Sequence, residues 1–266
     1  AGESLSKIAN DIGTTYHVCW HILKQRGVNT RKEGHLSNRK YNFNTTIFDK
    51  IDTEHKAYFL GFLFADGYNF EKRYTVSLRL SPIDIEIIEK FRNFLSINRD
   101  IQIVKPNPTR KGAFKNDRGS AGMIATDMHF SKNLASFGMT NKKSHSLKFP
   151  SENIVPLSML PHFIRGYFDG DGCISFTYRK CGHKPTFVTS FISSGIFIDS
   201  LQKIIFNVTK HHGTIAICDP TNPQSVETIE LRGNRVVETF LDWLYRDSTI
   251  FLSRKYEKYQ YLKRVN

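Results

Sequence analysis

The chain has 266 residues, with 38 Lys or Arg against 25 Asp or Glu, and its formal net charge is +13. This length suffices for one large domain or two smaller ones. The positive balance favours a polyanionic partner, with nucleic acid the first candidate over a protein that is merely basic. The longest apolar run, residues 57–65, has nine residues, whereas a membrane helix needs about 20, so we expect no membrane partner.

The first fifty residues are expected to form two short helices followed by a polar, basic linker, with Gly13 between the helices and Gly27 after them. The first helix has Leu5, Ile8, Ala9 and Ile12 on one face, and the second has Val18, Ile22 and Leu23. This arrangement resembles a helix-turn-helix, in which Tyr16 and His17 would face DNA. An ordinary helical hairpin is the alternative. The linker contains Arg31, Lys32, Arg39 and Lys40.

From about residue 51 the sequence repeats itself, with three matched segments in the same order at offsets of 105, 113 and 112 residues. The matched pairs are residues 59–67 with 164–172, 80–83 with 193–196, and 140–144 with 252–256. A period of this size is too long for a solenoid, whose repeats have roughly 20–50 residues. We therefore predict a duplicated α+β unit, with one copy in residues 51–150 and the other in 151–266.

Between the matched segments, apolar and polar residues alternate with the period of a β-strand, and the polar positions are rich in Arg, Thr and Ser. Such side chains suit phosphates and base edges, so we predict a nucleic-acid-binding surface; a face that simply meets water is the alternative. The predicted nucleic-acid contacts in the first copy are Arg73, Thr75, Ser77 and Arg79. Those in the second copy are Ser175, Thr177, Arg179, Thr228 and Arg232.

Each copy opens with a helix that carries small residues four positions apart, Gly61 with Ala65 and Gly166 with Gly170. A glycine inside a helix costs about 1 kcal/mol relative to alanine, so its presence calls for a packing reason. Small residues at this spacing let two helix backbones approach closely. We expect the two helices to pack against each other about a pseudo-twofold axis, with Gly61 and Gly166 at the interface.

Both helices end in Asp-Gly, at Asp66-Gly67 and Asp171-Gly172, where we expect each glycine to be a left-handed C-cap. Paired helices would bring the two carboxylates together at the negative ends of the helix dipoles, and adjacent carboxylates repel unless a cation holds them. Mg²⁺, which prefers oxygen ligands, fits this arrangement. Two solvated aspartates in β-turns are the alternative, and the duplication argues against it.

The two repeated helices resemble the LAGLIDADG motif of homing endonucleases in the single-chain form with two motifs. The resemblance covers roughly residues 51–266. It implies an α+β fold of two αββαββα halves with saddle-shaped antiparallel sheets that bind double-stranded DNA. Phe64 departs from the motif where the second copy has Asp169, and Arg165 is unusual on a buried helix.

The resemblance also implies an activity, namely site-specific hydrolysis of one phosphodiester in each DNA strand. Asp66 and Asp171 would bind the catalytic metal ions, helped by the carbonyls of Ala65 and Gly170. Mg²⁺ is the expected metal, with Mn²⁺ or Ca²⁺ able to replace it in binding. The basic residues that the family places near the scissile phosphates are expected to be Lys143 and Lys255, which hold matching places in the repeat.

Several alternatives and consequences accompany this interpretation. Each lysine has an alternative as a salt-bridged surface residue, and the whole chain has one as a DNA- or RNA-binding maturase or transcription regulator without cleavage. We expect a monomer with no obligate protein partner, and the resemblance implies a role in intron or intein mobility. The cysteines Cys19, Cys173, Cys181 and Cys218 form no CxxC pair and suit a reducing compartment, namely the cytoplasm of a prokaryote or phage host, or an organelle.

Overall fold

The computed structural model describes residues 5–28, 41–107, 118–141, 143–178, 184–222 and 225–266. The chain divides into two compact units, Ala1–Lys40 and Tyr41–Asn266. From the sequence we predicted this boundary after residue 50, which is ten residues later. The difference has a physical reason, because Ile47 and Phe48 are buried in the core of the second unit and Tyr41 and Phe43 pack against it. The basic linker residues Arg31, Lys32, Arg39 and Lys40 lie outside the described residues.

The first unit contains the two predicted helices, α1 (Leu5–Asp11) and α2 (Tyr16–Gln25). Gly13 and Gly27 adopt the left-handed backbone that ends each helix, with φ of +68° and +67°. The predicted apolar faces of these helices do not form a buried core. Ala9 and Cys19 are buried, but Ile12, Val18 and Ile22 are 43–64% exposed. Two helices of this length have too little surface to cover each other.

The second unit has the predicted order αββαββα twice, with short 3₁₀ turns between elements. The first half consists of α3 (Glu54–Asp66), β1 (Gly67–Phe70), β2 (Thr75–Leu80), α4 (Ile85–Leu95), β3 (Gln102–Val104), β4 (Ser120–Thr126) and α5 (Met128–Ser136). The second half consists of α6 (Leu160–Asp171), β5 (Cys173–Thr177), β6 (Thr186–Ser193), α7 (Gly195–Thr209), β7 (Thr214–Ile217), β8 (Glu227–Arg232), α8 (Asn234–Tyr245) and the additional α9 (Ser253–Val265).

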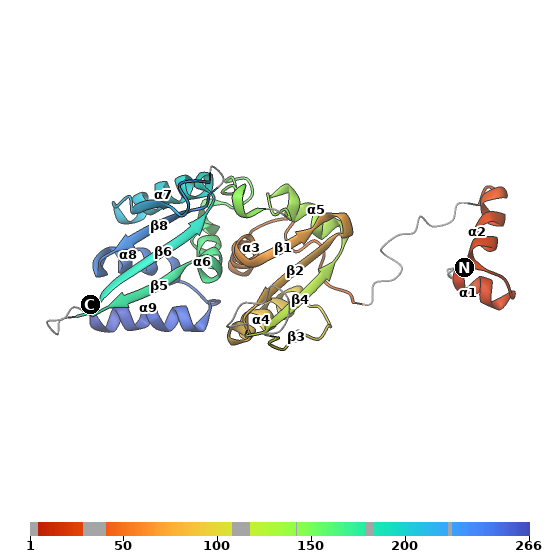
Figure 1. The fold of residues 1–266 in the computed structure, drawn as a ribbon, viewed down its shortest axis with the longest axis horizontal. Helices are drawn as coiled ribbons and strands as arrows, with labels where there is room; N and C mark the ends of the chain where they lie inside the picture. Colours follow the sequence, from red (N-terminus) through yellow and green to blue (C-terminus); the bar gives the residue numbers. More distant parts are fainter. Residues whose placement is uncertain (1–4, 29–40, 108–117, 142, 179–183, 223–224) are drawn as a thin grey trace. The chain divides into compact units, whose positions relative to one another are not determined.

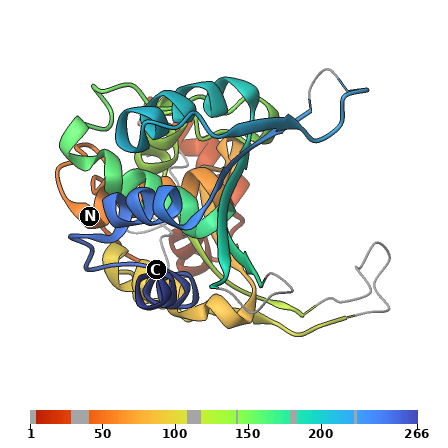
Figure 2. The ribbon, with the colours of Figure 1, turned by 90° about the vertical axis from the view of Figure 1, so that its left-hand side faces the viewer.

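Each half contains one antiparallel sheet, and the two sheets have the same strand order, β1-β2-β4-β3 and β5-β6-β8-β7. The paired helices α3 and α6 lie side by side between the two sheets (Figure 1). Within the second unit, Figure 2 shows the helices gathered on one side of the strands. The predicted α+β fold of two equivalent halves is therefore confirmed.

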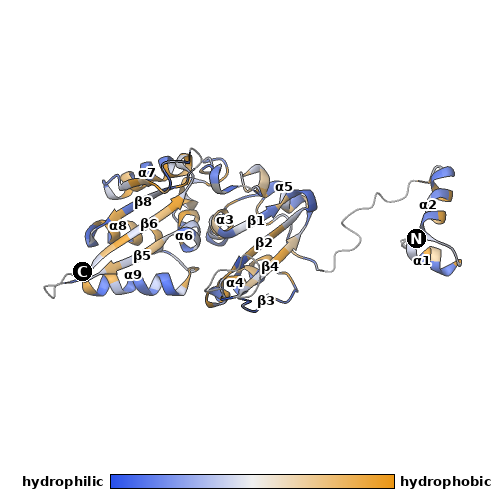
Figure 3. Cartoon of the chain, viewed as in Figure 1, coloured by the Kyte–Doolittle hydropathy of each residue, from blue (hydrophilic) through white to orange (hydrophobic). Residues whose placement is uncertain are grey.

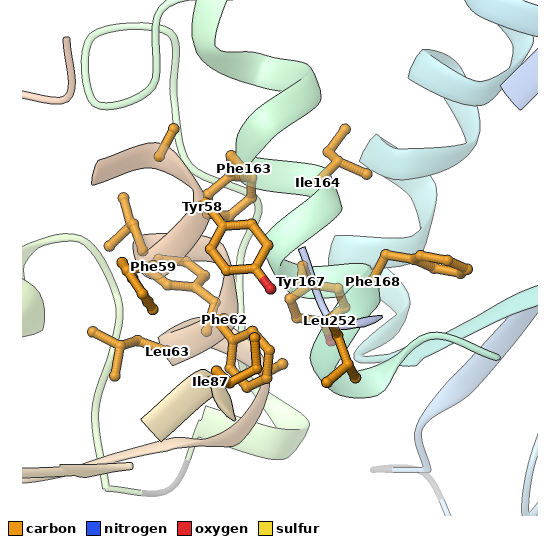
Figure 4. Close-up of a cluster of buried hydrophobic side chains, with 14 of the residues drawn as sticks. Tyr58, Phe59, Phe62, Leu63, Ile87, Phe163, Ile164, Tyr167, Phe168 and Leu252 are labelled. Atoms are coloured by element: carbon orange, nitrogen blue, oxygen red, sulfur yellow. The ribbon is translucent and has the colours of Figure 1, made fainter. Parts of the chain in front are cut away.

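The core is continuous across the two halves, because both motif helices contribute aromatic residues to it (Figure 4). Every residue of α3 from Ala57 to Ala65 is buried, which explains why this helix is apolar on all sides. Helix α9 is different, because it is mostly hydrophilic (Figure 3) and buries Lys255, Tyr259 and Leu262.

The two interface glycines allow the motif helices to touch through their backbones. A Cβ on Gly61 would lie 1.9 Å from the carbonyl oxygen of Phe163, and a Cβ on Gly166 would lie 1.9 Å from that of Tyr58. Both distances are far inside van der Waals contact, so no residue with a side chain fits at either place while the helices stay this close. The predicted reason for the glycines agrees with this geometry.

Candidate active site

The close approach of α3 and α6 brings their C-terminal ends together, and with them the two aspartates of the Asp-Gly pairs. A Cβ placed on Gly170 would lie 2.4 Å from the Cβ of Ala65 and 2.8 Å from Oδ2 of Asp66. The Asp66 carboxylate therefore lies against the last turn of α6, immediately before Asp171. The fourth small residue of the motifs, Gly170, leaves the space that this carboxylate fills.

The two carboxylates influence each other electrostatically. Desolvation, followed by the negative charge of Asp171, raises the pKa of Asp66 to about 6. Desolvation also raises the pKa of Asp171, while the charges of Lys143 and Lys255 and a hydrogen bond from Tyr167 lower it. This is the behaviour expected of two acidic groups that share one confined site, and it favours a cation between them.

The glycines that follow the aspartates differ from their predicted role. Gly67 and Gly172 are not left-handed C-caps, because their φ values of −72° and −83° with ψ near 150–160° are extended backbone. Their role is steric instead. A Cβ on Gly67 would lie 2.5 Å from the carbonyl oxygen of Leu63, and one on Gly172 would lie 2.0 Å from the Phe168 ring. The chain thus turns directly from each helix into a strand.

Both candidate lysines point their amino groups at the ends of the motif helices. The Nζ of Lys143 donates to the carbonyl of Ala65 at 2.5 Å. The Nζ of Lys255 lies 2.5 Å from the carbonyl oxygens of Phe168 and Gly172, 2.8 Å from that of Asp169 and 3.3 Å from that of Gly170. The negative end of a helix dipole attracts a cation at such a place.

Burial makes both lysines weaker bases. Desolvation lowers the pKa of Lys143, against the opposing charges of Asp171 and Asp66. Desolvation lowers the pKa of Lys255 to about 8, and this side chain is only 3% exposed. The geometry therefore differs from the surface salt bridge that was the alternative for these lysines.

The donors at this place fit a hard divalent cation. They are the carboxylates of Asp66 and Asp171 and the carbonyls of Ala65 and Gly170, oxygen ligands of the kind that Mg²⁺ and Ca²⁺ prefer. The two carbonyls also accept from Lys143 and Lys255, so a cation would share them with the lysine amino groups. In the described parts of the chain no group of three or more His, Cys, Asp or Glu side chains gathers to hold a metal. A cation here would therefore complete its coordination with main-chain oxygens, water or substrate.

A cavity of about 540 Å³ opens beside the Asp66 carboxylate and Gly170. Its lining includes Arg79, Arg118 and Arg254, and also Asp84. The sequence did not single out Arg118, Asp84 or Arg254, although Arg254 immediately precedes Lys255 in the third matched segment. Three arginines and three aspartates, Asp66, Asp84 and Asp169, line this cavity, and Asp84 pairs with Arg254. Arg79 and Arg118 are therefore the guanidinium groups that could accept an anionic group, such as a phosphate, near Asp66.

The predicted DNA-contact residues have different positions on the two sheets. Arg73 lies in a 3₁₀ turn (Glu71–Arg73), with its guanidinium 5.8 Å from the Phe70 ring, and not in the strand that was predicted to begin there. Thr75, Ser77 and Arg79 share the polar face of β2, where Arg79 is exposed and bonds Ser120 and Gln102. Strand β2 therefore has the predicted alternation from Thr75 onward.

In the second half, Ser175 and Thr177 are exposed on β5 and Arg232 is exposed at the end of β8, as the alternation predicts. Arg232 pairs with Glu230 at 2.6 Å, and Thr228 is partly buried. Arg179 and Cys181 lie outside the described residues. In the first unit, His17 is exposed and Tyr16 is partly buried, both in the first turn of α2.

The sequence pattern missed a buried polar network behind the site. The Asp169 carboxylate accepts hydrogen bonds from the hydroxyls of Tyr58 (2.9 Å) and Tyr245 (2.7 Å) and from the Leu252 amide (2.8 Å). Its first-copy counterpart Phe64 packs edge-on against Phe163. Arg165, the unusual charged residue of the second motif helix, pairs with a carboxylate, because its Nη2 lies 2.5 Å from Oε1 of Glu54.

The comparisons with known proteins are as follows. No protein-family profile matches the sequence. A probable translation initiation factor IF-2 from Methanocaldococcus jannaschii is 26% identical over 124 residues, which cover 46% of this chain and 9% of that protein. No helix among the described residues is both long and apolar enough to span a membrane.

Among solved structures, the LAGLIDADG homing endonuclease I-GzeII in complex with its DNA target matches with a TM-score of 0.52 and 12% identity, over 78% of this chain and 88% of that one. The meganuclease I-SmaMI bound to uncleaveable DNA has a TM-score of 0.49 and 15% identity, over 80% and 90% of the two chains. I-SmaMI bound to uncleaved DNA with calcium ions has a TM-score of 0.47 and 12% identity, over the same shares.

Proposed function

The chain has the fold of the LAGLIDADG homing endonucleases, and on this premise we propose that it is a site-specific endonuclease for double-stranded DNA. It hydrolyses one phosphodiester in each strand and depends on a divalent metal ion. The observation that carries the proposal is the pair of carboxylates, Asp66 and Asp171, held together at the ends of two helices by glycine packing. A structural role does not explain why both helices place an acid where the dipole is unfavourable.

The residues that would hold the metal are Asp66 and Asp171, with the carbonyls of Ala65 and Gly170 as further donors. A bound Mg²⁺ would supply Lewis acidity for phosphodiester hydrolysis. Lys143 and Lys255 contribute positive charge beside the carboxylates and stabilise the charge that develops on the phosphate. Desolvation lowers the pKa of Lys255 only to about 8, so this side chain is mostly protonated at neutral pH.

Binding of the duplex is assigned to the polar faces of the two sheets, together with Arg79 and Arg118 at the cavity. The first-unit residues Tyr16 and His17 extend the contact if the two helices work as a helix-turn-helix. Support comes from the net charge of +13 and from the exposed Arg, Ser and Thr side chains on β2, β5 and β8. Since both halves belong to one chain, we propose that a monomer cuts both strands without a protein partner.

The test is cleavage of a randomised duplex library in Mg²⁺, with sequencing of the cut ends, for wild type, Asp66→Asn, Asp171→Asn and the control Asp52→Asn. Asp52 is a surface residue whose carboxylate pairs with Lys56. Wild type and control are expected to cut a defined site, and the two active-site variants to bind this site without cutting it. EDTA should stop the wild type.

The second candidate is a maturase or transcription regulator that has the fold and binds nucleic acid without cleavage. The presence of both aspartates at equivalent places argues for the enzyme. If wild-type protein selects a sequence from the library but leaves it intact in Mg²⁺ and Mn²⁺, the binding protein is the correct interpretation.

A further inference from the structure

The segment that joins α8 to α9 is held by carboxylates from distant parts of the chain. Glu54, at the start of α3, accepts the amides of Thr249 at 2.7 Å and Ile250 at 3.2 Å. Asp169 accepts the amide of Leu252 at 2.8 Å. A connecting segment normally satisfies its amides with water or local turns, so this one is tied down to an unusual degree.

Two further carboxylates, both from the first half, hold the first residues of α9. The Glu86 carboxylate accepts the amide of Ser253 at 2.8 Å and its hydroxyl at 2.7 Å. Leu252, the N-cap residue, offers no side-chain cap, so Glu86 supplies the acceptor and the negative charge that a helix N-terminus favours. Lys90 reinforces the contact, because its Nζ bonds both Glu86 and the carbonyl of Phe251.

Asp84 fixes the next residue. Its two carboxylate oxygens accept from Nε and Nη2 of Arg254 at 2.7 and 3.0 Å, a bidentate pair in which the aspartate side chain is 11% exposed. Asp84 also lines the cavity beside Asp66. Because both of its oxygens are taken by Arg254, Asp84 acts here as an anchor for α9.

The residue that follows these two anchors is Lys255. Ser253, Arg254 and Lys255 are consecutive in the first turn of α9, whose beginning faces the first half of the molecule in Figure 1. A helical turn is rigid, so fixing the two preceding residues fixes the direction in which the Lys255 side chain leaves the backbone. The first half thereby sets the position of an amino group that belongs to the second half.

Among the described residues of the other half, no carboxylate is found that holds the segment before Lys143 in the same way. The sequence repeat aligns Asp84 with Phe197 and Glu86 with Asp199; Phe197 is buried in the core and Asp199 is exposed. Among the described residues, the acceptor found for the amino group of Lys143 is the single carbonyl of Ala65. The two lysines are therefore supported in different ways, although they hold matching places in the repeat.

We propose that Asp84 and Glu86 are positioning residues for Lys255 and act on the cut of one strand only. This inference rests on the proposed endonuclease function. It explains why two acidic side chains of a strongly basic protein lie next to its candidate active site without joining the pair of aspartates. Removing either anchor lets the start of α9 move, and displacement of a catalytic group by about 1 Å can cost up to roughly 100-fold in rate.

The first experiment measures single-turnover cleavage of a duplex target whose strands carry different fluorescent labels. The variants are Glu86→Gln and Asp84→Asn, with Lys255→Met to identify the Lys255-dependent strand and Asp199→Asn as the matched control. Glu86→Gln and Asp84→Asn are expected to slow that strand by about 10- to 100-fold, with little change in the other strand or in DNA affinity. Equal slowing of both strands, or no slowing, overturns the proposal.

A second measurement is independent of cleavage and reads the position of Lys255 directly. The reaction of each lysine with an acylating reagent is followed by mass spectrometry in the free protein. Lys255 should be protected in wild type and in Asp199→Asn and react several-fold faster in Glu86→Gln and Asp84→Asn, while Lys143 stays unchanged. Unchanged protection of Lys255 contradicts the positioning role, whereas failure of wild type to cut any DNA contradicts the proposed function alone.

Discussion

Asp66 keeps its proton to a higher pH in the folded protein than in the unfolded chain. Its pKa rises from the ordinary 3.8 to about 6, first through desolvation and then through the charge of Asp171. The folded state therefore binds more protons between these values, and the free energy of unfolding falls as the pH rises from about 3.8 to about 6. Ionised Asp66 destabilises the metal-free protein at neutral pH.

Asp66→Asn should accordingly melt a few degrees above wild type at pH 7 in EDTA, because it removes this repulsion. The difference should vanish near pH 4, where wild-type Asp66 is protonated, and should shrink in Mg²⁺, because a bound cation stabilises the wild type. Differential scanning fluorimetry measures the difference in melting temperature under all three conditions, namely pH 7 with EDTA, pH 4, and Mg²⁺. An Asp66→Asn variant that melts below wild type at pH 7 in EDTA would contradict the carboxylate pair.

The pH dependence of the cleavage rate should reflect the shifted pKa values of both Asp66 and Lys255. It should rise with pH through about 6 as Asp66 ionises and fall above about 8 as Lys255 loses its proton. A higher Mg²⁺ concentration should shift only the rising, acidic part of this pH–rate profile, and it should shift it to lower pH. The reason is that the metal ion and the proton compete for the same carboxylate. Single-turnover rates at two Mg²⁺ concentrations test this. If the acidic part of the profile does not shift with the Mg²⁺ concentration, the titrating group is not Asp66.

Among individual residues, the sequence predicted the paired aspartates and the two lysines, because all four occupy matching places in the repeat. It could not predict what surrounds them. Arg254 meets Asp84 across 170 residues of sequence, and this contact depends on how α9 packs against the first half. The surroundings of Asp169 could not be predicted either. Its position in the motif does not indicate the two tyrosine hydroxyls that donate hydrogen bonds to its buried carboxylate.

The contact between α3 and α6 gives a prediction for the helices themselves. Gly61→Ala would place a Cβ 1.9 Å from a main-chain oxygen of α6, and the helices would have to separate. We expect a loss of about 1–3 kcal/mol or more in urea unfolding, together with loss of cleavage. Gly195→Ala is the matched control, because its Cβ would meet only the end of the Glu227 side chain. Equal stability of the two variants would contradict the close packing.

Glu54 joins the start of α3 to the second half, so its removal should affect more than one element. Glu54→Ala would leave the guanidinium of Arg165, which is fully buried, without its carboxylate. We expect a loss of about 3–5 kcal/mol in chemical unfolding, against almost none for the exposed control Glu89→Ala. Burial alone would raise the pKa of Glu54, but hydrogen bonds from Thr249 and the charge of Arg165 outweigh it and lower that pKa. The stability that Glu54 contributes should therefore decline as the pH falls through the lowered pKa.

Elements were predictable where the pattern was local or repeated. The alternation along β2 and β5 and the two motif helices came from single segments. Arg73 was assigned to a strand because the alternation seemed to continue backwards, but Tyr74 has a left-handed backbone, with φ of 50°, and interrupts it. The extended backbone of Gly67 and Gly172 followed from contacts with Leu63 and Phe168, which a cap signature does not contain.

For the whole molecule, the division at Lys40 separates a body with its own core from a small basic unit. The first 40 residues contain seven Lys or Arg against three Asp or Glu. If their helices contact DNA, the contribution is largely electrostatic and depends on salt. The affinity of a DNA-binding protein falls with salt concentration, with a logarithmic slope of about 0.9 for each phosphate contact on a duplex.

A protein of residues 41–266 should therefore unfold at the same temperature as the full chain, because the core of the second unit is intact. It should still cut the target in Mg²⁺, since both aspartates and both lysines remain. Its DNA affinity should be lower and its salt slope smaller, by about one for each lost phosphate contact. Fluorescence anisotropy across a salt series measures both. Identical slopes for the two proteins would mean that the first unit does not contact DNA.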